Sequence, residues 1–363
     1  MSPHGLLIVM PLFNDWSACD HLLTLVDAAL TEHGIAGAVV VVDDGSTVSM
    51  PEHFAEHSYR ALSRVEVLRL RRNLGHQRAI CTGLAHVERS MANDWEAVVL
   101  MDSDGEDDPR DIPRLLEKYH SEGGKKIVFA QRTRRSESWG FRAGYAVFRL
   151  LHRLLTAHGV QVGNFSIIPP ARLRSLVVSP ELWNHYAAAV RVCRLPQCSV
   201  PTARGKRLAG EGRMSFVSLV IHGLSAISIF SDVVGVRLLL AALFVVAATA
   251  LGVGTVVAIK LLTTGLAIPG WATSTVGLLL VILLQAIALS VIFSFIILAG
   301  RNGATFLPTR DCGILVDRLD TVYSRTLAGA SENCVLRASS AVAAVIFHND
   351  ETRDVIPPDG VTL

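Results

Sequence analysis

Short apolar runs alternate with amphipathic segments along the first part of the chain. Two of these runs, 5–10 and 38–42, are continuous, rich in branched residues, and end at polar positions. Runs of this kind predict strands that are buried on both faces, as in a parallel sheet. Further strands are predicted at 65–70, 96–101 and 126–131, and helices at 17–34, 76–90 and 110–123. This alternating order predicts an open α/β sheet.

Polar clusters follow three of the predicted strands. They are 11-PLFND-15, 43-DDGS-46 and 102-DSDGEDD-108. Ligands of open α/β sheets bind outside the carboxyl ends of the strands. The three clusters are therefore expected to converge at one edge of the sheet and to form a ligand site there.

The most acidic cluster lies in 98-VVLMDSDGEDDP-109, where an apolar strand ends in five carboxylates: Asp102, Asp104, Glu106, Asp107 and Asp108. An EF-hand calcium loop needs Gly at its sixth position and Glu at its twelfth. Counted from Asp102, those positions hold Asp107 and Pro113. An EF-hand is thus excluded, and the chain also has no GxGxxG fingerprint and no Walker A loop.

Two roles are expected for the acids of this cluster. A surface turn that leads into a helix accounts for Asp107 and Asp108, because a helix N-terminus favours anions. It does not account for Asp102, which ends a fully apolar strand. Two carboxylates spaced Asp-x-Asp can bind one hard divalent cation, Mg²⁺ or Mn²⁺, which keeps open positions for the oxygens of a diphosphate.

The composition points to a membrane. Half of the 363 residues are hydrophobic and 18% are charged, which is more apolar than an ordinary soluble enzyme. The excess lies in two uncharged runs, 238–259 and 275–300, and the first is long enough to span about 33 Å as a helix. We therefore predict a transmembrane hairpin over 233–300. The formal net charge of +2 gives no reason to expect a nucleic-acid partner.

The flanking charges predict an orientation for the hairpin. Arginines flank its outer ends, whereas the connection between the two runs carries only Lys260. The positive-inside rule then places the α/β region and both termini in the cytoplasm, with a multi-pass hairpin in the inner membrane. Six scattered cysteines fit reduced thiols in that compartment. Gly252 and Gly254 permit close helix packing, and we expect a homo-oligomer.

Two further segments flank the hairpin. Residues 214–232 have apolar positions at helical spacing with basic residues on the N-terminal side, which predicts an amphipathic helix in the membrane interface. A helix packed on the sheet is the alternative. Residues 301–363 are expected to form a cytoplasmic extension without a recognisable motif, with a possible helix at 314–328 and a strand or short helix at 340–347.

Six motifs occur in order along the chain: 11-PLFND-15, 42-VDDGST-47, 73-NLGHQRA-79, 102-DSDGEDDP-109, 163-GNFSII-168 and 207-RLAGEGR-213. With the two apolar runs, they resemble the GT-A, family 2 glycosyltransferases, and within these the polyprenyl-phosphate glycosyltransferases (dolichyl-phosphate mannose synthase-like). The resemblance runs from about residue 5 to residue 300. It implies a GT-A, Rossmann-like domain over 1–213, followed by the interfacial helix and the transmembrane hairpin.

Several positions depart from the family pattern. Phe13 stands in place of tyrosine, Asp15 in place of glutamate and Glu106 in place of glutamine. Asp108 replaces the first proline of the acidic motif, and Gly212 with Arg213 replaces Ser-Lys. These departures affect the expected specificity more than the expected reaction. The Q-x-x-R-W signature of processive synthases is missing, which favours transfer of one sugar per event.

The resemblance implies a role for particular side chains. It implies a nucleotide site formed by Pro11, Phe13, Asp15, Asp43 and Asp44, although the sequence does not rank the two adjacent acids. A divalent cation, Mg²⁺ or Mn²⁺, would be held by Asp102, Asp104 and Glu106. Arg132 and Arg142 would bind donor phosphates, and Arg207 and Arg213 would bind the acceptor phosphate. Asp104, Arg132 and Arg207 are the expected catalytic residues.

The implied activity is an inverting, hexosyltransferase-type reaction. One sugar would pass from a nucleotide-sugar donor to a polyprenyl phosphate acceptor in the membrane lipid, yielding a lipid-linked sugar for cell-envelope biosynthesis. A phosphate acceptor is already ionised, so no catalytic histidine is assigned, and structural or interfacial roles are expected for His76 and His222. Two alternatives stay open: a family 2 transferase acting on another lipid, or a non-catalytic sugar-nucleotide-binding membrane scaffold. The sequence does not identify the sugar.

Overall fold

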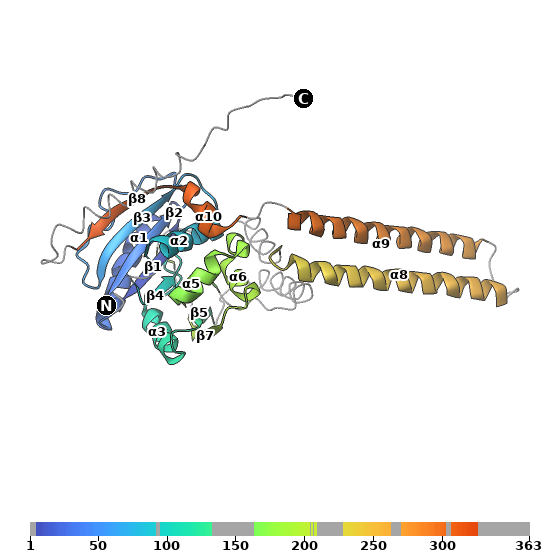
Figure 1. Ribbon diagram of the computed structural model, residues 1–363, viewed down its shortest axis with the longest axis horizontal. Coiled ribbons are helices and arrows are strands. Elements are labelled where there is room, and N and C mark those ends of the chain that lie inside the picture. The colour runs from blue at the N-terminus through green and yellow to red at the C-terminus, as the bar shows by residue number, and fades with distance from the viewer. Residues whose placement is uncertain are drawn as a thin grey trace, which may run out of the picture. The chain divides into compact units, whose positions relative to one another are not determined.

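The computed structural model describes residues 5–91, 95–132, 163–203, 205, 207–208, 228–262, 270–302 and 306–325. Within these residues the strands form one sheet with the order β7-β5-β6-β4-β1-β2-β3-β8 (Figure 1). Their bounds are β1 Leu6–Leu12, β2 Gly37–Asp43, β3 Leu62–Leu70, β4 Ala97–Leu100, β5 Ile127–Arg132, β6 Ser166–Ile168, β7 Gln197–Thr202 and β8 Val316–Ser324.

Helices connect and cover these strands. Those of the α/β region are α1 Trp16–Glu32, α2 His76–Met91, η1 Pro109–Asp111, α3 Ile112–Ser121, α5 Pro170–Val177, η2 Pro180–Trp183 and α6 Tyr186–Val192. The long apolar helices are α8 Ser231–Leu262 and α9 Trp271–Asn302, and the short elements α10 Pro308–Asp311 and η3 Cys312–Leu315 follow them. The five strands and three helices that the sequence predicted in the first 131 residues are confirmed, with shifted ends.

Alternate residues of β1 point to two separate cores. Leu6, Ile8 and Met10 pack with α1 and α3, whereas Leu7 and Val9 pack with α2, α5 and α6. The alternation follows from the two-residue period of a strand, and both faces are apolar because helices cover both. All seven residues of β1 and all seven of β2 are buried. This rigid centre fixes where the strands end.

Strands β4, β1, β2 and β3 run parallel to one another, so their carboxyl ends lie at the same edge of the sheet. The short strand β6 is antiparallel to both β4 and β5 and separates them. The sheet is therefore mixed rather than purely parallel. Three residues are too few to give a period in the sequence, which is why β6 was not predicted.

The segment after the long helices returns to the sheet. The sequence allowed a helix at 314–328, and over the described part this prediction is wrong: β8 is an edge strand next to β3. The apolar positions Val316, Leu319 and Val322 fit a helical spacing, but the strand hydrogen-bonds to an existing sheet edge. The ring of Tyr323 also packs edge-on against that of Tyr59 at 4.9 Å. The predicted element at 340–347 lies outside the described residues.

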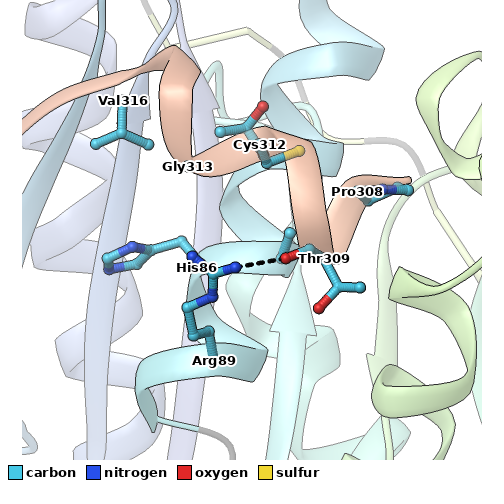
Figure 2. Close-up of a pocket in the computed structure, with 9 residues that line it drawn as sticks. His86, Arg89, Pro308, Thr309, Cys312, Gly313 and Val316 are labelled. Carbon is cyan, nitrogen blue, oxygen red and sulfur yellow. Dashed lines mark hydrogen bonds between the residues drawn. The ribbon is translucent and has the colours of Figure 1, made fainter. Parts of the chain in front are cut away.

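Elements α10 and η3 pack on α2 and enclose a small pocket (Figure 2). Arg89 Nη2 donates to the Thr309 carbonyl at 2.6 Å across this pocket, and Cys312 is buried beside it. Burial lowers the pKa of His86, another residue of the lining. The pocket contains none of the residues that the sequence singled out. Its walls are contacts that hold the returning segment to the α/β region.

Helices α8 and α9 pack against each other and have the character of membrane spans. The apolar stretches Asp232–Leu262 and Trp271–Ile296 have mean hydropathies of 2.4 and 2.8. Only 6% of the most apolar part of each helix is buried, whereas a core helix of a soluble protein is mostly buried. These two helices match the hairpin predicted over 233–300. Of the predicted interfacial helix 214–232, residues 214–227 lie outside the described residues, and Ser231 already begins α8.

Candidate active site

The three polar clusters meet where β4, β1 and β2 end. Ser103 Oγ donates to the Pro11 carbonyl at 2.7 Å, which joins the turn after β4 to β1. The Asp44 backbone N–H donates to the Leu12 carbonyl at 2.8 Å, which joins the turn after β2 to the same strand. The convergence that parallel strands predicted is therefore found in the structure.

Asn14 holds the loop after β2 in place. Its backbone has φ 55°, in the left-handed region that Asn tolerates better than most residues. Its Oδ1 accepts the backbone N–H groups of Thr47 at 2.8 Å and Val48 at 2.9 Å, and its own N–H donates to Ser46 Oγ at 2.9 Å. Asn14 lies inside 11-PLFND-15 but was not among the predicted site residues. Beside it, the large ring of Phe13 is 40% exposed and available to a ligand.

The structure distinguishes the two adjacent acids that the sequence could not rank. Both oxygens of Asp44 accept backbone N–H groups, from Leu74 at 2.7 Å and from Gly75 at 2.9 Å. Burial raises the pKa of Asp44, and these two hydrogen bonds oppose that rise. Asp43 instead caps its own turn through the Ser46 N–H at 2.9 Å and lies 3.5 Å from Arg69 Nη1. Asp44 thus ties the 73-NLGHQRA-79 turn to the site.

The acidic turn is folded by its own carboxylates. Asp107 Oδ2 accepts the Asp102 N–H at 3.1 Å, and Asp104 Oδ1 accepts the Glu106 N–H at 3.0 Å. Asp108 caps η1 by accepting the Arg110 N–H at 3.0 Å, as expected for an acid before a helix. The predicted helix-capping role is confirmed for Asp108, whereas Asp107 closes the turn instead.

Basic side chains contact two of the three acids expected to bind a metal, Asp102 and Asp104. Arg207 Nη1 donates to Asp104 Oδ2 at 3.1 Å, and Nη2 of the same guanidinium donates to Asp15. His76 Nε2 lies 3.3 Å from Asp102 Oδ1. Burial raises the pKa of Asp104 and nearby acids add to this rise, while Arg207 opposes it. The repulsion that the sequence implied is therefore present and partly offset by protein cations.

Gly205, Arg207 and Leu208 contact the acidic turn. The N–H of Gly205 donates to the Glu106 carbonyl at 2.9 Å, and that of Leu208 donates to the Asp104 carbonyl at 3.0 Å. Gly105 has φ 81°, and a Cβ there would come within 2.4 Å of Leu208 Cγ. A glycine is required at this point both for the backbone angle and for the close approach. The contact positions Arg207 over the carboxylates.

A polar network that the sequence did not predict supports Asp102. Gln77 Nε2 donates to Asn164 Oδ1 at 3.2 Å and Gln77 Oε1 accepts the Tyr186 N–H at 2.8 Å. Asn164 Nδ2 lies 3.0 Å from His76 Nε2 and 3.5 Å from Asp102 Oδ1. Burial alone would lower the pKa of His76, but Asp102 outweighs it and the pKa is raised. His76 and Asn164 each lie within one of the six sequence motifs. Membership of these motifs was the only sequence signal that could have pointed to them.

The remaining predicted residues differ in where the structure places them. Pro11 lies within β1 and takes part through its backbone, and Arg132 is the last residue of β5. Arg142 and Arg213 lie outside the described residues. In 163-GNFSII-168, Phe165 is buried and residues 166–168 form β6, so the aromatic ring packs in the core rather than facing the site.

The acidic turn carries the residues that were predicted to bind a metal ion. Over the described ranges, no group of three or more His, Cys, Asp or Glu side chains is arranged to hold a metal ion. The assignment of Asp102, Asp104 and Glu106 as ligands stays a prediction. Carboxylate oxygens are the ligand type that a hard divalent cation takes, and Asp102 and Asp104 each lie beside a basic side chain.

Comparison with known proteins shows what the segment that carries this site is similar to. Residues 7–173 match the sequence model of Glycosyl transferase family 2. The chain is 25% identical over 224 residues to the undecaprenyl-phosphate 4-deoxy-4-formamido-L-arabinose transferase of Salmonella dublin, covering 59% of this chain and 63% of that protein. The same enzyme of an Enterobacter species is 25% identical over 229 residues, covering 60% and 64%. The match thus spans less than two thirds of these relatives.

Solved structures show partial similarity. Glucosyl-3-phosphoglycerate synthase from Mycobacterium tuberculosis in complex with Mn²⁺, uridine diphosphate and phosphoglyceric acid has 17% identity and a TM-score of 0.43, covering 64% of this chain and 79% of that one. Mannosyl-3-phosphoglycerate synthase from Rubrobacter xylanophilus has 13% identity and a TM-score of 0.41, covering 63% and 73%. The segment that matches the family model runs from β1 into α5 and contains the convergent strand ends with their acidic motifs. Residues 7–173 are thus similar to the glycosyl transferase family 2 model, and in this chain two apolar helices follow them.

Proposed function

We propose that this protein is an inverting glycosyltransferase that transfers one sugar from a nucleotide-sugar to a polyprenyl phosphate at the cytoplasmic face of the inner membrane. The proposal draws on the family 2 domain, on the two apolar helices and on relatives named as undecaprenyl-phosphate sugar transferases. The observation that carries it is the position of Arg207 between Asp15 and Asp104. This arginine connects the nucleotide motif to the acidic motif within one site.

The donor would be bound from the β1 and β2 ends. The exposed Phe13 offers a ring face on which a base can stack, and Asp15 offers a carboxylate acceptor for hydroxyl groups. Asp43 is assigned to the same nucleotide site by resemblance. Asp44 is occupied by two backbone N–H groups and would shape this site rather than bind the nucleotide. The donor phosphates would then lie toward the acidic turn, with Arg132 and Arg142 as further cationic partners.

The acidic turn would hold the divalent cation. Asp102 and Asp104 are the proposed ligands, with Glu106 assigned by resemblance. When bound, Mg²⁺ or Mn²⁺ neutralises the charge that develops on the leaving nucleoside diphosphate. His76 and Asn164 would keep Asp102 oriented through their contacts with its Oδ1. No proton acceptor is needed, because a phosphate monoester is already ionised at neutral pH.

The acceptor phosphate would be positioned by Arg207 and Arg213. A guanidinium binds phosphate through a planar, bidentate fork, which suits holding a nucleophile on the opposite side of the sugar from its leaving group. That geometry gives inversion. The Arg207 guanidinium contacts Asp15 and Asp104, which would orient it toward the acceptor.

The returning strand supports the proposed orientation in the membrane. β3 precedes the two apolar helices and β8 follows them, yet the two strands are neighbours in one sheet. The segments on either side of the helical pair must then lie on the same side of the bilayer. Together with the arginine-rich flanks, this supports a catalytic domain in the cytoplasm.

A transfer assay with the purified full-length protein tests the proposal. The protein is incubated with labelled nucleotide-sugars, Mn²⁺ and undecaprenyl phosphate, and the lipid fraction is analysed for a product. Asp104→Asn should abolish transfer, whereas Asp108→Asn is a matched control in the same turn, because Asn also caps helices. Membrane insertion of both variants is checked by fractionation.

Three outcomes are informative. A labelled polyprenyl product that depends on Asp104 supports the proposal. Transfer only to a different lipid, or nucleotide binding without turnover, overturns it in favour of another acceptor or a non-catalytic scaffold. Full activity of Asp104→Asn would overturn the metal assignment.

A further inference from the structure

Strand β8 brings an acid from beyond the membrane helices to the nucleotide side of the sheet. It lies next to β3, and β3 lies next to β2, whose last residue is Asp43. In the parallel register of β2 and β3, Asp43 pairs with Arg69. Asp320 of β8 faces the same arginine. Three neighbouring strands thus contribute one acid, one arginine and one acid in a row.

The contacts of Arg69 are directional. Its Nε donates to Asp320 Oδ2 at 2.6 Å, and its Nη1 lies 3.5 Å from Asp43 Oδ2. Its Nη2 lies 3.8 Å from the Met50 sulfur, and its Cζ lies 6.0 Å from the centre of the Trp16 ring. A guanidinium held at Nε keeps its two terminal nitrogens in a fixed plane. Asp320 therefore sets the direction in which Arg69 presents its charge.

Asp43 depends on that charge. Its side chain is 5% exposed, and a buried carboxylate is costly unless a cation or hydrogen bonds compensate it. Its other oxygen already accepts the Ser46 N–H, which shapes the turn of the nucleotide motif. Burial alone would raise the pKa of Asp320, but hydrogen bonds from Arg69 and Arg318 outweigh it and lower the pKa. Asp320 is thus a charged partner for Arg69 at neutral pH.

We propose that Asp320 is a positioning residue for nucleotide-sugar binding, which holds Arg69 in the orientation that compensates and directs Asp43. This inference rests on the proposed function, because Asp43 belongs to the nucleotide site only there. It gives the segment after the membrane helices a role in donor binding. The sheet edge, the arginine and the nucleotide turn then act as one unit.

The test measures nucleotide affinity of the full chain in detergent. UDP, GDP, CDP and dTDP are titrated calorimetrically in the presence of Mn²⁺, and the nucleotide that binds is used with every variant. Asp320→Asn should weaken binding about fivefold, the scale of a partly exposed ion pair. Asp317→Asn is the matched control: it lies on the same strand, pairs with Arg318 at 3.4 Å and should leave the affinity unchanged.

A double-mutant cycle separates positioning from general stability. Arg69→Gln should weaken binding, and Asp320→Asn added to it should cause no further loss, because the two residues act in series. Arg69→Lys, which keeps the charge and loses the Nε donor, replaces Arg69→Gln if that variant does not accumulate. In the transfer assay, Asp320→Asn should raise the donor KM and leave kcat near that of the unmodified chain.

The outcomes distinguish this inference from the proposed function. If Asp43→Asn loses nucleotide binding and Asp320→Asn binds normally, the inference is overturned and the proposed function stands. If Asp320→Asn lowers only the melting temperature, the residue is structural and the inference is again overturned. If the unmodified chain binds none of the nucleotides and forms no product, the proposed function fails and the inference fails with it.

Discussion

Arg207 Nη1 lies 3.1 Å from Asp104 Oδ2, in the position where a divalent cation would compete for the same oxygen. The sequence predicted that this arginine would bind the acceptor phosphate, and the structure places it on two carboxylates. Both statements fit one side chain if the arginine neutralises the acids before the cation and substrates bind. Arg207 and a divalent cation would therefore compete for Asp104, and this competition can be measured.

Replacing Arg207 with Gln should therefore separate metal binding from catalysis. Mn²⁺ affinity should rise about fivefold, because a competing ion pair of about 1 kcal/mol is removed from Asp104. Transfer should fall, because the acceptor phosphate loses its guanidinium. Free Mn²⁺ measured by electron paramagnetic resonance reports the first effect without any turnover. Arg110→Gln, which removes the partner of Asp108, is the control. Weaker Mn²⁺ binding in Arg207→Gln would contradict the competition.

Gly105→Ala should disturb the contact between the acidic turn and Leu208. The left-handed φ of 81° costs an alanine about 1 kcal/mol, and its Cβ would lie 2.4 Å from Leu208 Cγ. The Leu208 backbone must then move away from the Asp104 carbonyl. We expect a lower melting temperature and a loss of transfer. Adding Leu208→Ala should restore part of the transfer, since it removes the clash but not the backbone strain. Equal activity of the single and double variants would show that the clash is relieved in another way.

The convergence of the motifs could be predicted because it depends on sheet geometry. Parallel strands end at one edge, so the clusters after β1, β2 and β4 had to meet, and the structure joins them through Ser103 and Asn14. The partners of Asp102 could not be predicted in the same way. His76 and Asn164 are 88 residues apart in the chain, and their contact depends on where α2 and β6 are placed.

The returning strand could not be recognised for a different reason. Val316, Leu319 and Val322 repeat every three residues, which is compatible with a helix. What decides the structure is the unpaired edge of β3, and that edge is far away in the sequence. A partner strand satisfies its backbone groups, and the ion pair between Arg69 and Asp320 adds to this. The prediction for 314–328 failed because local pattern carries no information about a distant sheet edge.

A truncation series tests whether the returning segment belongs to the catalytic domain. A chain that ends after residue 325 keeps every described element and serves as the reference. A chain that ends after residue 305 loses β8, the buried Cys312 and the ring contacts of Phe306 and Tyr323. We expect it to lose about 3 kcal/mol or more of stability and to aggregate through the exposed β3 edge. Thermal unfolding and size-exclusion chromatography compare the two, and equal stability would refute the assignment of β8 to the domain.

Glu66 provides a test of the electrostatics of the sheet itself. Its side chain is 6% exposed, Oε1 lies 3.5 Å from Arg64 Nη1, and among the described residues Oε2 has no hydrogen-bond partner. Burial raises the pKa of Glu66, and Arg64 opposes this only in part. An acid whose pKa is higher in the folded state binds protons more tightly there. Its ionised form then destabilises the fold at pH values above the folded pKa, and this penalty disappears below the unfolded pKa of about 4.3.

Glu66→Gln should accordingly stabilise the protein at neutral pH, by about 1 kcal/mol, because a neutral amide avoids burial of the charge. The advantage should shrink as the pH falls through the folded pKa and should be lost near about pH 4, where the native glutamate is protonated. Melting temperatures of the two proteins, measured from about pH 4 to about pH 8, check this, with the exposed Glu52→Gln as the control. A difference that stays constant with pH would mean that side-chain packing, and not ionisation, sets the effect. A less stable variant at neutral pH would mean that the ion pair with Arg64 outweighs the burial of the carboxylate.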